Sequence, residues 1–325
     1  MTEAAPGCEQ LTPAGKLRHL LRLQGLSREF IVDLLDRAED YQRRKGGRPA
    51  RDNALLGRTV ANLFFEPSTR TRASFELAAK RMCADVLNLD VNMSSRIKGE
   101  SLLDTIYTLQ AMAVDVFVVR DASAGIPDFI ANEVDDHVSV LNAGESDVAH
   151  PTQGLLDLLT IRQAKETLDG LTVTIIGDLR HSRVARSAAE GLAIVGNNEL
   201  RLVAPPGLKP NMKQYPTATY FEDIDEAVSN ADVVMALRIQ RERIKEKSSL
   251  MTGVQYLHRY GITQDRVALA KPDAIVMHPG PMNRDVEISS RVADGPRSVV
   301  TNQVTNGVAV RMAVLAAVME SRERT

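Results

Sequence analysis

Hydroxyl and arginine side chains are concentrated directly after the apolar segment 60–65, in the run Ser68, Thr69, Arg70 and Thr71. The apolar segment is typical of a buried strand, and a helix is predicted to start within the polar run. A helix start presents several unbonded N–H groups and the positive end of its dipole. Together with the arginine and the hydroxyls, these groups could bind a phosphate. The alternative is an ordinary capped helix with solvated arginines, because capping hydroxyls are common at helix starts.

Two further polar groups follow apolar segments in the first half of the chain. Arg120 comes directly after residues 116–119, and His150 begins a predicted helix in which Gln153 lies one turn further on. The positive end of a helix dipole disfavours an imidazolium, so a neutral His150 could donate a hydrogen bond to a carbonyl oxygen. The alternatives are a solvated strand end for Arg120 and a structural hydrogen bond for His150.

Three polar segments follow apolar segments in the second half of the chain. The segment 177–183 contains Arg183 but lacks the three-glycine spacing of a dinucleotide-binding loop. Arg238 and Gln240 alternate, so they would face the same way in an extended segment, although a charged loop is the alternative. The turn 278–281 carries two prolines, which fix the directions of backbone carbonyls, and one of them is a candidate for a cis peptide bond.

The polar segment 94–100 contains Ser94 and Lys98 beside a glycine, and by itself it is best interpreted as a mobile surface loop. Taken together, the candidate groups are arginines, hydroxyls and neutral donors at strand ends. We find no paired carboxylates, no defensible Ser-His-Asp order and no metal-ligand spacing. Such a site could hold two anionic substrates and polarise a carbonyl, so that catalysis would depend on orientation and electrostatics rather than on a covalent intermediate.

The composition is that of an ordinary globular protein and excludes several classes of function. The 325 residues are 44% hydrophobic and 25% charged, with a net charge of −2, which argues against broad affinity for nucleic acid or an anionic membrane. Cys8 and Cys83 are too few and too far apart for a zinc cluster or a disulfide framework. No segment has the apolar character of a signal peptide or a membrane span. We therefore expect a cytoplasmic protein.

Strand and helix patterns alternate along the chain and would position these polar groups. The strands are short, apolar and rich in valine, which suits parallel sheets that are covered on both faces. In the first half, strands are predicted at 59–65, 85–89, 114–119 and 138–142, helices at 28–44, 69–83, 101–112 and 126–135, and a loop at 142–145. In the second half, strands are predicted at 171–176, 199–203, 232–237 and 274–277, and helices at 152–165, 183–195, 223–230 and 303–320.

The chain is long for a single core, so two domains are expected. The predicted fold class is α/β, with two open doubly wound parallel-sheet domains and the active site in the interdomain cleft, where the strands end. The first domain is predicted at residues 1–150, with the C-terminal helix 303–325 returning to it, and the second at residues 151–302.

Two long motifs resemble those of a known family. The segment 65–72, Phe-Glu-Pro-Ser-Thr-Arg-Thr-Arg, followed by Ser-Phe-Glu at 74–76, resembles the carbamoyl-phosphate signature of the transcarbamoylases. The segments His-Pro-Thr-Gln at 150–153 and Leu-Leu-Asp-Leu at 155–158 resemble their second signature. The resemblance extends over about residues 14–320, and it implies a transferase that uses carbamoyl phosphate.

Other segments resemble the aspartate-specific branch of that family. These are the segment 94–100 around Lys98 and the segment 237–243, whereas the Ser-Met-Gly segment and the His-Cys-Leu-Pro turn usual in ornithine-specific members are absent. The resemblance therefore implies that carbamoyl phosphate and L-aspartate give N-carbamoyl-L-aspartate and phosphate, the committed step of pyrimidine biosynthesis, without a cofactor or a metal.

The resemblance also implies a role for each candidate residue. Ser68, Thr69, Arg70 and Thr71 would bind the phosphate, Arg120, His150 and Thr71 would polarise the carbamoyl carbonyl, and Gln153 would accept from its amino group. Arg183, Arg238 and Gln240 would bind the aspartate carboxylates, and the Gly280 carbonyl, held between Pro279 and Pro281, would aim the amine.

Members of this family form trimers with shared active sites, in which the loop carrying Ser94 and Lys98 reaches a neighbouring subunit. Whether a zinc-bearing regulatory chain or a dihydroorotase-like chain joins the trimer is left open by the sequence, and residues 1–13 could contact such a partner. Two departures from the family pattern concern the substrate-binding groups. Asp121 follows Arg120, with which it could pair or from which it could point away, and Ile97 precedes Lys98.

Two alternatives to an aspartate-specific enzyme remain open at this stage. One is a transcarbamoylase with another amine acceptor, such as ornithine, although two arginines in the second domain favour a dicarboxylate over a cationic amine. The other is a catalytically silent homologue that acts as a scaffold or a regulatory subunit. The complete set of candidate residues argues against this second alternative, because a silent chain need not retain them.

Overall fold

The computed structural model describes residues 9–43, 51–89, 101–240 and 251–321. The chain divides into two compact units, which we name unit 1 and unit 2. Unit 1 comprises the chain up to Thr152 and from Asn306 onward, and unit 2 comprises Gln153–Thr305. The assignment of a ligand to each domain, and the cleft expected between the domains, stay predictions.

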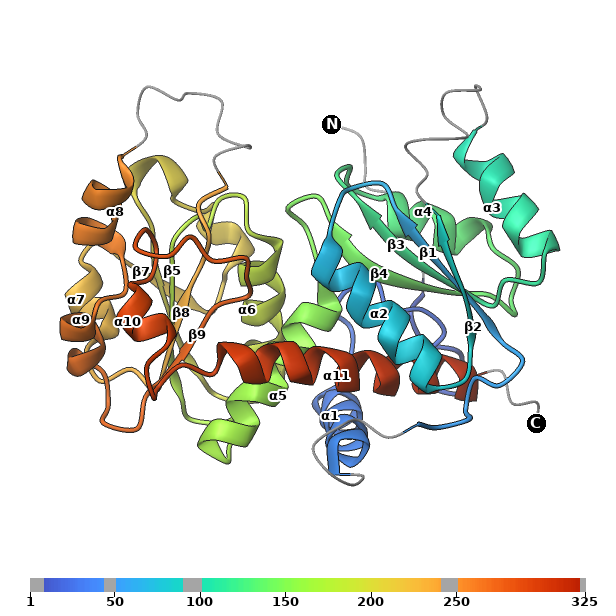
Figure 1. Ribbon diagram of the computed structural model, residues 1–325, viewed down its shortest axis with the longest axis horizontal. Coiled ribbons are helices and arrows are strands. Elements are labelled where there is room, and N and C mark those ends of the chain that lie inside the picture. The colour runs from blue at the N-terminus through green and yellow to red at the C-terminus, as the bar shows by residue number, and fades with distance from the viewer. Residues whose placement is uncertain (1–8, 44–50, 90–100, 241–250, 322–325) are drawn as a thin grey trace. The chain divides into compact units, whose positions relative to one another are not determined.

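Unit 1 is built on a four-stranded parallel sheet in the order β2-β1-β3-β4 (Figure 1). The three strands β1, β3 and β4 are almost entirely buried, whereas β2 at the edge is partly exposed. Helix α2 packs on β1 and β2, and α4 packs on β3 and β4. The elements are α1 (Arg28–Arg43), β1 (Thr59–Phe64), α2 (Thr69–Arg81), β2 (Asp85–Leu89), α3 (Leu102–Ala111), β3 (Val116–Asp121), α4 (Ile126–Glu133) and β4 (Ser139–Glu145).

Unit 2 is built on a five-stranded parallel sheet in the order β7-β6-β5-β8-β9 (Figure 1). Helix α7 packs on β5, β6 and β7. The strands are β5 (Thr172–Ile176), β6 (Glu199–Val203), β7 (Ala218–Phe221), β8 (Val233–Ala236) and β9 (Ile275–Met277). The helices are α5 (Pro151–Lys165), α6 (Arg183–Val195), the short 3₁₀ turns Pro206–Leu208 and Met212–Gln214, α7 (Ile224–Val228), α8 (Gly253–Tyr260), α9 (Gln264–Leu269) and α10 (Ser290–Ala293). Helix α11 (Val300–Glu320) begins in unit 2 and continues into unit 1 from Asn306 onward. The predicted two-domain α/β fold with parallel sheets is confirmed.

Each sheet has a point at which the order of the strands reverses. Strand β1 pairs with β2 on one side and with β3 on the other, and β5 pairs with β6 on one side and with β8 on the other. Because the strands are parallel, the segments that follow β1 and β3 leave the sheet at the same edge, as do those that follow β5 and β8. Open α/β sheets bind ligands at such switch points. The polar segments that contain Ser68–Thr71, Arg120, 177–183 and Arg238–Gln240 follow or end the strands at these two points.

Several elements differ from the sequence prediction. The segment 142–145, expected as a loop, is the last part of β4, because Asn142 and Glu145 bond to each other within the strand and need no solvent. Strand β7 and helices α8, α9 and α10 were not predicted, since they are short, and α11 begins at Val300 rather than at residue 303. The start of α8 did carry a sequence signal: Thr252 and Gln255 form a capping box.

Helix α11 is buried on nearly all sides over residues 309–319, which matches its apolar sequence. Its C-terminal part belongs to unit 1, where the guanidinium of Arg311 lies 4.9 Å from the centre of the Phe75 ring in α2. The Glu320 carbonyl accepts a hydrogen bond from the Lys16 Nζ at 3.0 Å. No helix in the described part of the chain is both long enough and apolar enough to cross a membrane.

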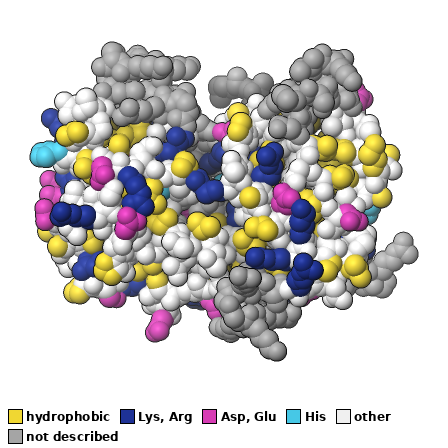
Figure 2. Space-filling view, viewed as in Figure 1, with side chains coloured by type: hydrophobic (Ala, Val, Ile, Leu, Met, Phe, Trp, Pro, Cys, Tyr) yellow, Lys and Arg dark blue, Asp and Glu magenta, His cyan; other side chains and the backbone are white. Residues whose placement is uncertain are grey.

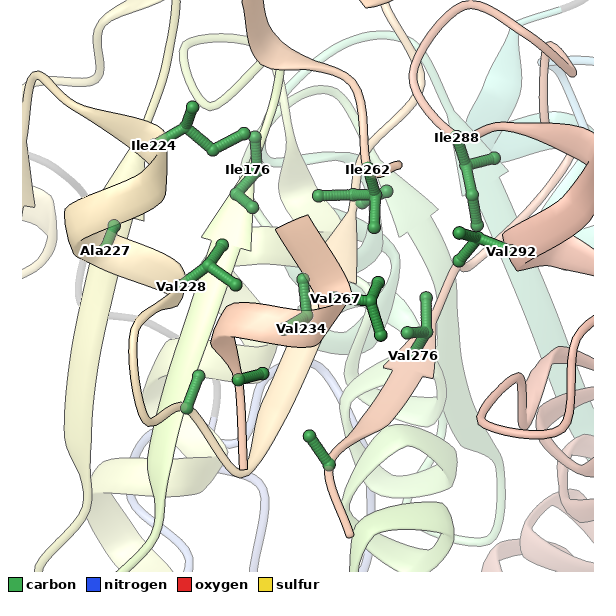
Figure 3. Close-up of a cluster of buried hydrophobic side chains, with 14 of the residues drawn as sticks. Ile176, Ile224, Ala227, Val228, Val234, Ile262, Val267, Val276, Ile288 and Val292 are labelled. Carbon is green, nitrogen blue, oxygen red and sulfur yellow. The ribbon is translucent and has the colours of Figure 1, made fainter. Parts of the chain in front are cut away.

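The core on one side of the unit 2 sheet joins strands β5, β8 and β9 to helices α7, α9 and α10 (Figure 3). Val234 and Val276 project from the strands toward residues of these helices and of the connecting segments. Ile262 is fully buried in this cluster, and its backbone N–H donates to the Glu287 carbonyl at 2.9 Å. This packing anchors the segment 282–288, which follows the turn after β9.

The substitution Ile262→Ala should destabilise the protein by about 2–5 kcal/mol, because the lost side chain leaves a cavity in a closely packed core. The exposed Leu269→Ala, in the neighbouring helix α9, is the matched control and should change stability by less than about 0.5 kcal/mol. Urea unfolding followed by circular dichroism measures both, since the chain has no tryptophan for fluorescence. Equal losses in the two variants would contradict the assignment of this core.

Candidate active site

The turn between β1 and α2 presents a helix N-terminus without an acidic side chain. Ser68 is the N-cap residue in an extended conformation, and among the described residues its side chain makes no capping hydrogen bond. The first turn of α2 contains no Asp or Glu, so the positive end of the dipole is not offset there. Thr71 is buried, whereas Thr69 and Arg70 are exposed. This geometry is suited to an anion that would take the place of the missing cap.

Arg120 is held in a buried position beside this turn. It is 9% exposed and lies where the pairing of β3 with β4 shifts register. Its Nη2 forms an ion pair with Glu66 Oε2 at 3.0 Å, and its Nη1 donates to the Ala143 carbonyl at 3.1 Å. Its own carbonyl accepts from the Phe65 N–H at 2.9 Å. These contacts tie the guanidinium both to the turn after β1 and to β4.

Asp121, which follows Arg120, is the last residue of β3, and its carboxylate bonds to the turn that follows. Asp121 Oδ1 accepts a hydrogen bond from the Ser123 backbone N–H at 2.7 Å, so this carboxylate stabilises its own turn. Arg120 forms an ion pair with Glu66, which belongs to the first signature segment. Sequence reasoning did not assign a role to Glu66, because nothing in its local pattern indicates that β3 lies beside it.

His150 is placed by a short loop between β4 and α5. The Glu145 N–H donates to the Ala149 carbonyl at 2.9 Å, which closes the loop immediately before His150. Glu145 itself is buried and accepts from the Gly125 N–H and from Asn142 Nδ2. Burial raises the pKa of the Glu145 carboxyl, whereas the Gly125 N–H acts in the opposite direction. His150 is only 4% exposed, so its imidazole is shielded from water at the start of α5.

Gln153 lies one helical turn after His150 and is also buried. Its Nε2 donates to Asp157 Oδ1 at 3.0 Å. Because the nitrogen side of the amide is held by a carboxylate, the oxygen side points away from that carboxylate and can act as an acceptor. Asp157 is 1% exposed, and its charge within an apolar helical run was a sequence signal that we did not use.

In unit 2, the loops after β5 and β8 are in direct contact. Gly177 has φ of +134°, and a Cβ at this position would lie 2.6 Å from the Leu237 carbonyl oxygen. The Gln240 Nε2 donates to the His181 carbonyl at 2.9 Å. Asp178 is fully buried and accepts from the N–H groups of His181 and Gln240 at 3.2 and 3.3 Å. Only glycine permits this approach of the two loops.

Asp178 is also bonded to an imidazole, since its Oδ1 lies 2.9 Å from His181 Nδ1. Burial raises the pKa of the Asp178 carboxyl, and the neighbouring His181 counteracts this effect. Sequence reasoning treated the segment 177–183 as a possible dinucleotide loop and rejected it. Its observed role is to brace the segment that carries Gln240.

The two predicted arginines of unit 2 flank these loops. Arg183 is the first residue of α6 and is 8% exposed. The N-cap residue of this helix is Ser182, whose hydroxyl accepts a hydrogen bond from the Ala185 N–H at 3.1 Å. Arg238 follows β8 and is half-buried, as is Gln240, whereas Ile239 between them is 4% exposed. This exposure pattern agrees with the predicted alternation, in which Arg238 and Gln240 face away from the core.

The turn after β9 is held rigidly by the side chain of His278. The Gly280 N–H donates to His278 Nδ1 at 2.8 Å, so the ring proton lies on Nε2, which is 3.2 Å from Glu287 Oε1. The peptide bond between Gly280 and Pro281 is cis, as expected for one of the two prolines. Because β9 pairs with β8, this turn leaves the sheet at the same edge as Arg238.

The structure places the predicted residues in two sets, one in each unit, and Gln153, which was predicted to contact carbamoyl phosphate, is the first residue of unit 2. Within the described residues, no group of three or more His, Cys, Asp or Glu side chains is arranged to hold a metal ion. On the face shown in Figure 2, basic and acidic side chains are interspersed. Ser94 and Lys98 lie outside the described residues. In unit 1, the residues on the side of the sheet where the parallel strands end are Ser68, Thr69, Arg70, Thr71, Arg120 and His150. In unit 2, the residues on the corresponding side are Arg183, Arg238, Gln240, Gly280 and Pro281.

The chemistry available to each set is the binding of an anion. Unit 1 offers hydroxyls, a helix N-terminus and a buried arginine, a combination suited to a phosphate and to negative charge that develops on a nearby oxygen. Unit 2 offers two arginines and an amide, which suit carboxylates. The buried carboxylates of Asp157 and Asp178 accept hydrogen bonds that orient other groups, and the partly exposed carboxylate of Glu66 forms an ion pair with Arg120.

Comparison with known families agrees with this division. Residues 18–163 match the family model described as the aspartate/ornithine carbamoyltransferase carbamoyl-P binding domain. Residues 169–318 match the model described as the aspartate/ornithine carbamoyltransferase Asp/Orn binding domain. The two matches together span most of the chain.

Solved structures of both specificities are similar to this chain. Aspartate transcarbamoylase from Trypanosoma cruzi in complex with carbamoyl phosphate is 33% identical, with a TM-score of 0.84 over 92% of this chain and 95% of that one. The same enzyme in complex with N-(phosphonacetyl)-L-aspartic acid is 33% identical, with a TM-score of 0.82 over 95% and 98%. Ornithine carbamoyltransferase from Thermus thermophilus is 26% identical, with a TM-score of 0.80 over 93% and 99%.

The contact between the loops after β5 and β8 predicts that Gly177→Ala destabilises the protein by more than about 1 kcal/mol, since alanine adds both backbone strain and a steric clash. Gly170→Ala is the matched control, because Gly170 has φ of +71° but nothing within 4 Å of an added Cβ. Gly170→Ala should be destabilised only by the backbone strain of alanine at a positive φ, because it adds no steric clash. Equal destabilisation in thermal unfolding experiments would show that the Leu237 contact is unimportant.

Proposed function

The chain belongs to the aspartate/ornithine carbamoyltransferase family, and we propose that it transfers the carbamoyl group of carbamoyl phosphate to the amino group of L-aspartate, giving N-carbamoyl-L-aspartate and phosphate. The observation that carries the aspartate assignment is the presence in unit 2 of two arginines, Arg183 at the start of α6 and Arg238 after β8. Two fixed positive charges favour a dicarboxylate and disfavour the cationic side chain of ornithine.

Unit 1 is proposed to bind the phosphate of carbamoyl phosphate at the start of α2. Ser68, Thr69 and Thr71 would supply hydroxyl groups, and Arg70 would supply a charge-assisted hydrogen bond. The helix N-terminus adds its N–H groups and the positive end of its dipole. The first turn contains no Asp or Glu that would offset this positive charge. Ser94 is proposed to contribute a further hydroxyl.

The carbamoyl carbonyl is proposed to be polarised by Arg120, His150 and Thr71. When the unprotonated amine attacks the carbonyl carbon, negative charge develops on the carbonyl oxygen, and these donors stabilise it. Loss of one such donor typically costs about 2.7–4 kcal/mol of transition-state stabilisation. The ion pair with Glu66 fixes the Arg120 guanidinium before the substrate binds, so little reorganisation is needed.

The same step requires the bond from the carbonyl carbon to the phosphate oxygen to break. The departing phosphate can accept the proton that the amine releases, so the reaction needs no carboxylate base. Gln153 is proposed to accept a hydrogen bond from the carbamoyl amino group through its Oε1. The contact of its Nε2 with Asp157 supports this orientation.

Unit 2 is proposed to bind aspartate. Arg183 and Arg238 would bind its carboxylates together with Gln240, whose amide is held by the His181 carbonyl. The Gly280 carbonyl, set between Pro279 and Pro281, would accept from the attacking amine, and Lys98 would complete the site.

We further propose that the chain forms a homotrimer in which Ser94 and Lys98 contribute to the active site of a neighbouring subunit. The enzyme is proposed to act in the cytoplasm, in pyrimidine biosynthesis. A larger assembly with a regulatory or dihydroorotase-like chain is compatible with this proposal. Native mass spectrometry measures the number of chains in the complex.

We expect the purified protein to form carbamoyl aspartate from carbamoyl phosphate and aspartate, and to form no citrulline from ornithine. Arg238→Ala should raise the KM for aspartate at least tenfold, the effect of losing roughly one charge-assisted hydrogen bond, while the KM for carbamoyl phosphate changes little. Ornithine turnover would assign the chain to the other branch. An absence of turnover with both amines would favour a scaffold or regulatory subunit.

The phosphate assignment predicts that Arg70→Ala abolishes measurable turnover while the native mass of the complex stays the same. The reason is that the variant loses a charged donor to the phosphate but no core packing, since Arg70 is exposed. Lys80→Ala, at an exposed cation near the other end of α2, is the control and should retain activity. Near-normal activity of Arg70→Ala would refute the assignment.

A further inference from the structure

One buried carboxylate in unit 2 orients two amide side chains. Asp157 Oδ1 accepts from Gln153 Nε2 at 3.0 Å and from Gln303 Nε2 at 2.8 Å. All three residues are at least nine-tenths buried, with exposures of 1% for Asp157, 8% for Gln153 and 3% for Gln303. A charge in such a position is stable only when hydrogen bonds replace its water.

The network continues from Gln303 to the turn after β9. The Gln303 Oε1 accepts from the His278 N–H at 2.9 Å, and the His278 Nδ1 accepts from the Gly280 N–H at 2.8 Å. Since Gln303 donates to Asp157 with its nitrogen, its oxygen has to face His278. One carboxylate is thus connected both to Gln153 and to the Gly280 turn.

The chemistry of a carboxylate makes this orientation unambiguous. An ionised carboxylate only accepts hydrogen bonds, whereas an amide can donate with one end and accept with the other. If the Gln153 amide were turned around, its oxygen would face Asp157 and the two acceptors would repel each other. Asp157 therefore excludes the orientation in which Gln153 presents N–H groups to a ligand.

We propose that Asp157 is a positioning residue that makes the site select an acyl phosphate with an amino group over one with a methyl group. This inference rests on the proposed function, because it assumes that Gln153 meets the acyl group of the substrate. With its oxygen fixed toward the ligand, Gln153 accepts from a carbamoyl NH₂ and leaves an acceptor unpaired beside an acetyl CH₃. A site built to bond an N–H group discriminates strongly against an analogue that lacks it.

The probe is acetyl phosphate, which shares the phosphate and carbonyl of carbamoyl phosphate. Its transfer forms the bond from the amine nitrogen to the acetyl carbon, breaks the bond to phosphate and gives N-acetyl-aspartate. The measured quantity is the ratio of kcat/KM for carbamoyl phosphate to kcat/KM for acetyl phosphate. A general loss of packing would lower both values and leave their ratio unchanged.

In Asp157→Asn the partner of Gln153 becomes an amide that both donates and accepts, so Gln153 can turn either way. We expect the ratio to fall about tenfold, the effect of roughly one hydrogen bond, mainly through loss of activity with carbamoyl phosphate. Asp157→Leu should lower the ratio by a similar factor. It replaces the asparagine variant in the experiment if that variant does not fold, since an apolar residue of similar volume can replace a buried charge.

Thr160→Val is the matched control within α5. It removes another buried hydrogen bond of the same helix, from Thr160 Oγ1 to the Leu156 carbonyl at 2.7 Å, and it should keep the ratio of the wild type. Circular dichroism establishes that each variant is folded.

A folded Asp157 variant with an unchanged ratio would overturn the proposal, and so would the failure of both variants to fold, which would make Asp157 a stability residue. A wild-type protein that forms no carbamoyl aspartate would instead refute the proposed function.

Discussion

The parallel pairing of β1 with β3, and of β5 with β8, is the constraint on which the rest of the candidate site depends. Parallel strands end at the same edge, so the segments that follow them are neighbours even when more than fifty residues separate them in the sequence. Arg120 meets Glu66 for this reason, and Gly177 meets Leu237 for the same reason. A strand shifted by one residue would turn each side chain to the other face of the sheet.

Acidic side chains hold the candidate binding groups in place. Glu66 fixes Arg120, Asp178 braces the segment that carries Gln240, and Asp157 fixes Gln153. Asp157 and Asp178 lose hydration in the interior, and their hydrogen bonds compensate for that loss. The orientation of the donors is therefore set during folding, which is the condition under which fixed dipoles stabilise developing charge most effectively.

This arrangement explains how transfer chemistry can proceed without a catalytic carboxylate base. The acids near the candidate site are occupied as acceptors for arginine, amide and backbone N–H groups. The groups left to face a substrate are cations, hydroxyls and neutral donors, which suit two anionic reactants. In the proposed reaction, the leaving phosphate takes the proton that the attacking amine releases.

The sequence by itself determined the fold class, the positions of most strands and the residue types at the strand ends, because apolar periodicity and capping residues act locally. It also identified Ser68–Thr71, Arg120, His150 and the arginines of unit 2 as candidates. It did not reveal β7, the extension of β4 or the roles of Glu66, Asp178 and Gln303. Those were decided only by the tertiary structure, since these side chains find partners that are distant in the sequence, across pairings that no local pattern encodes.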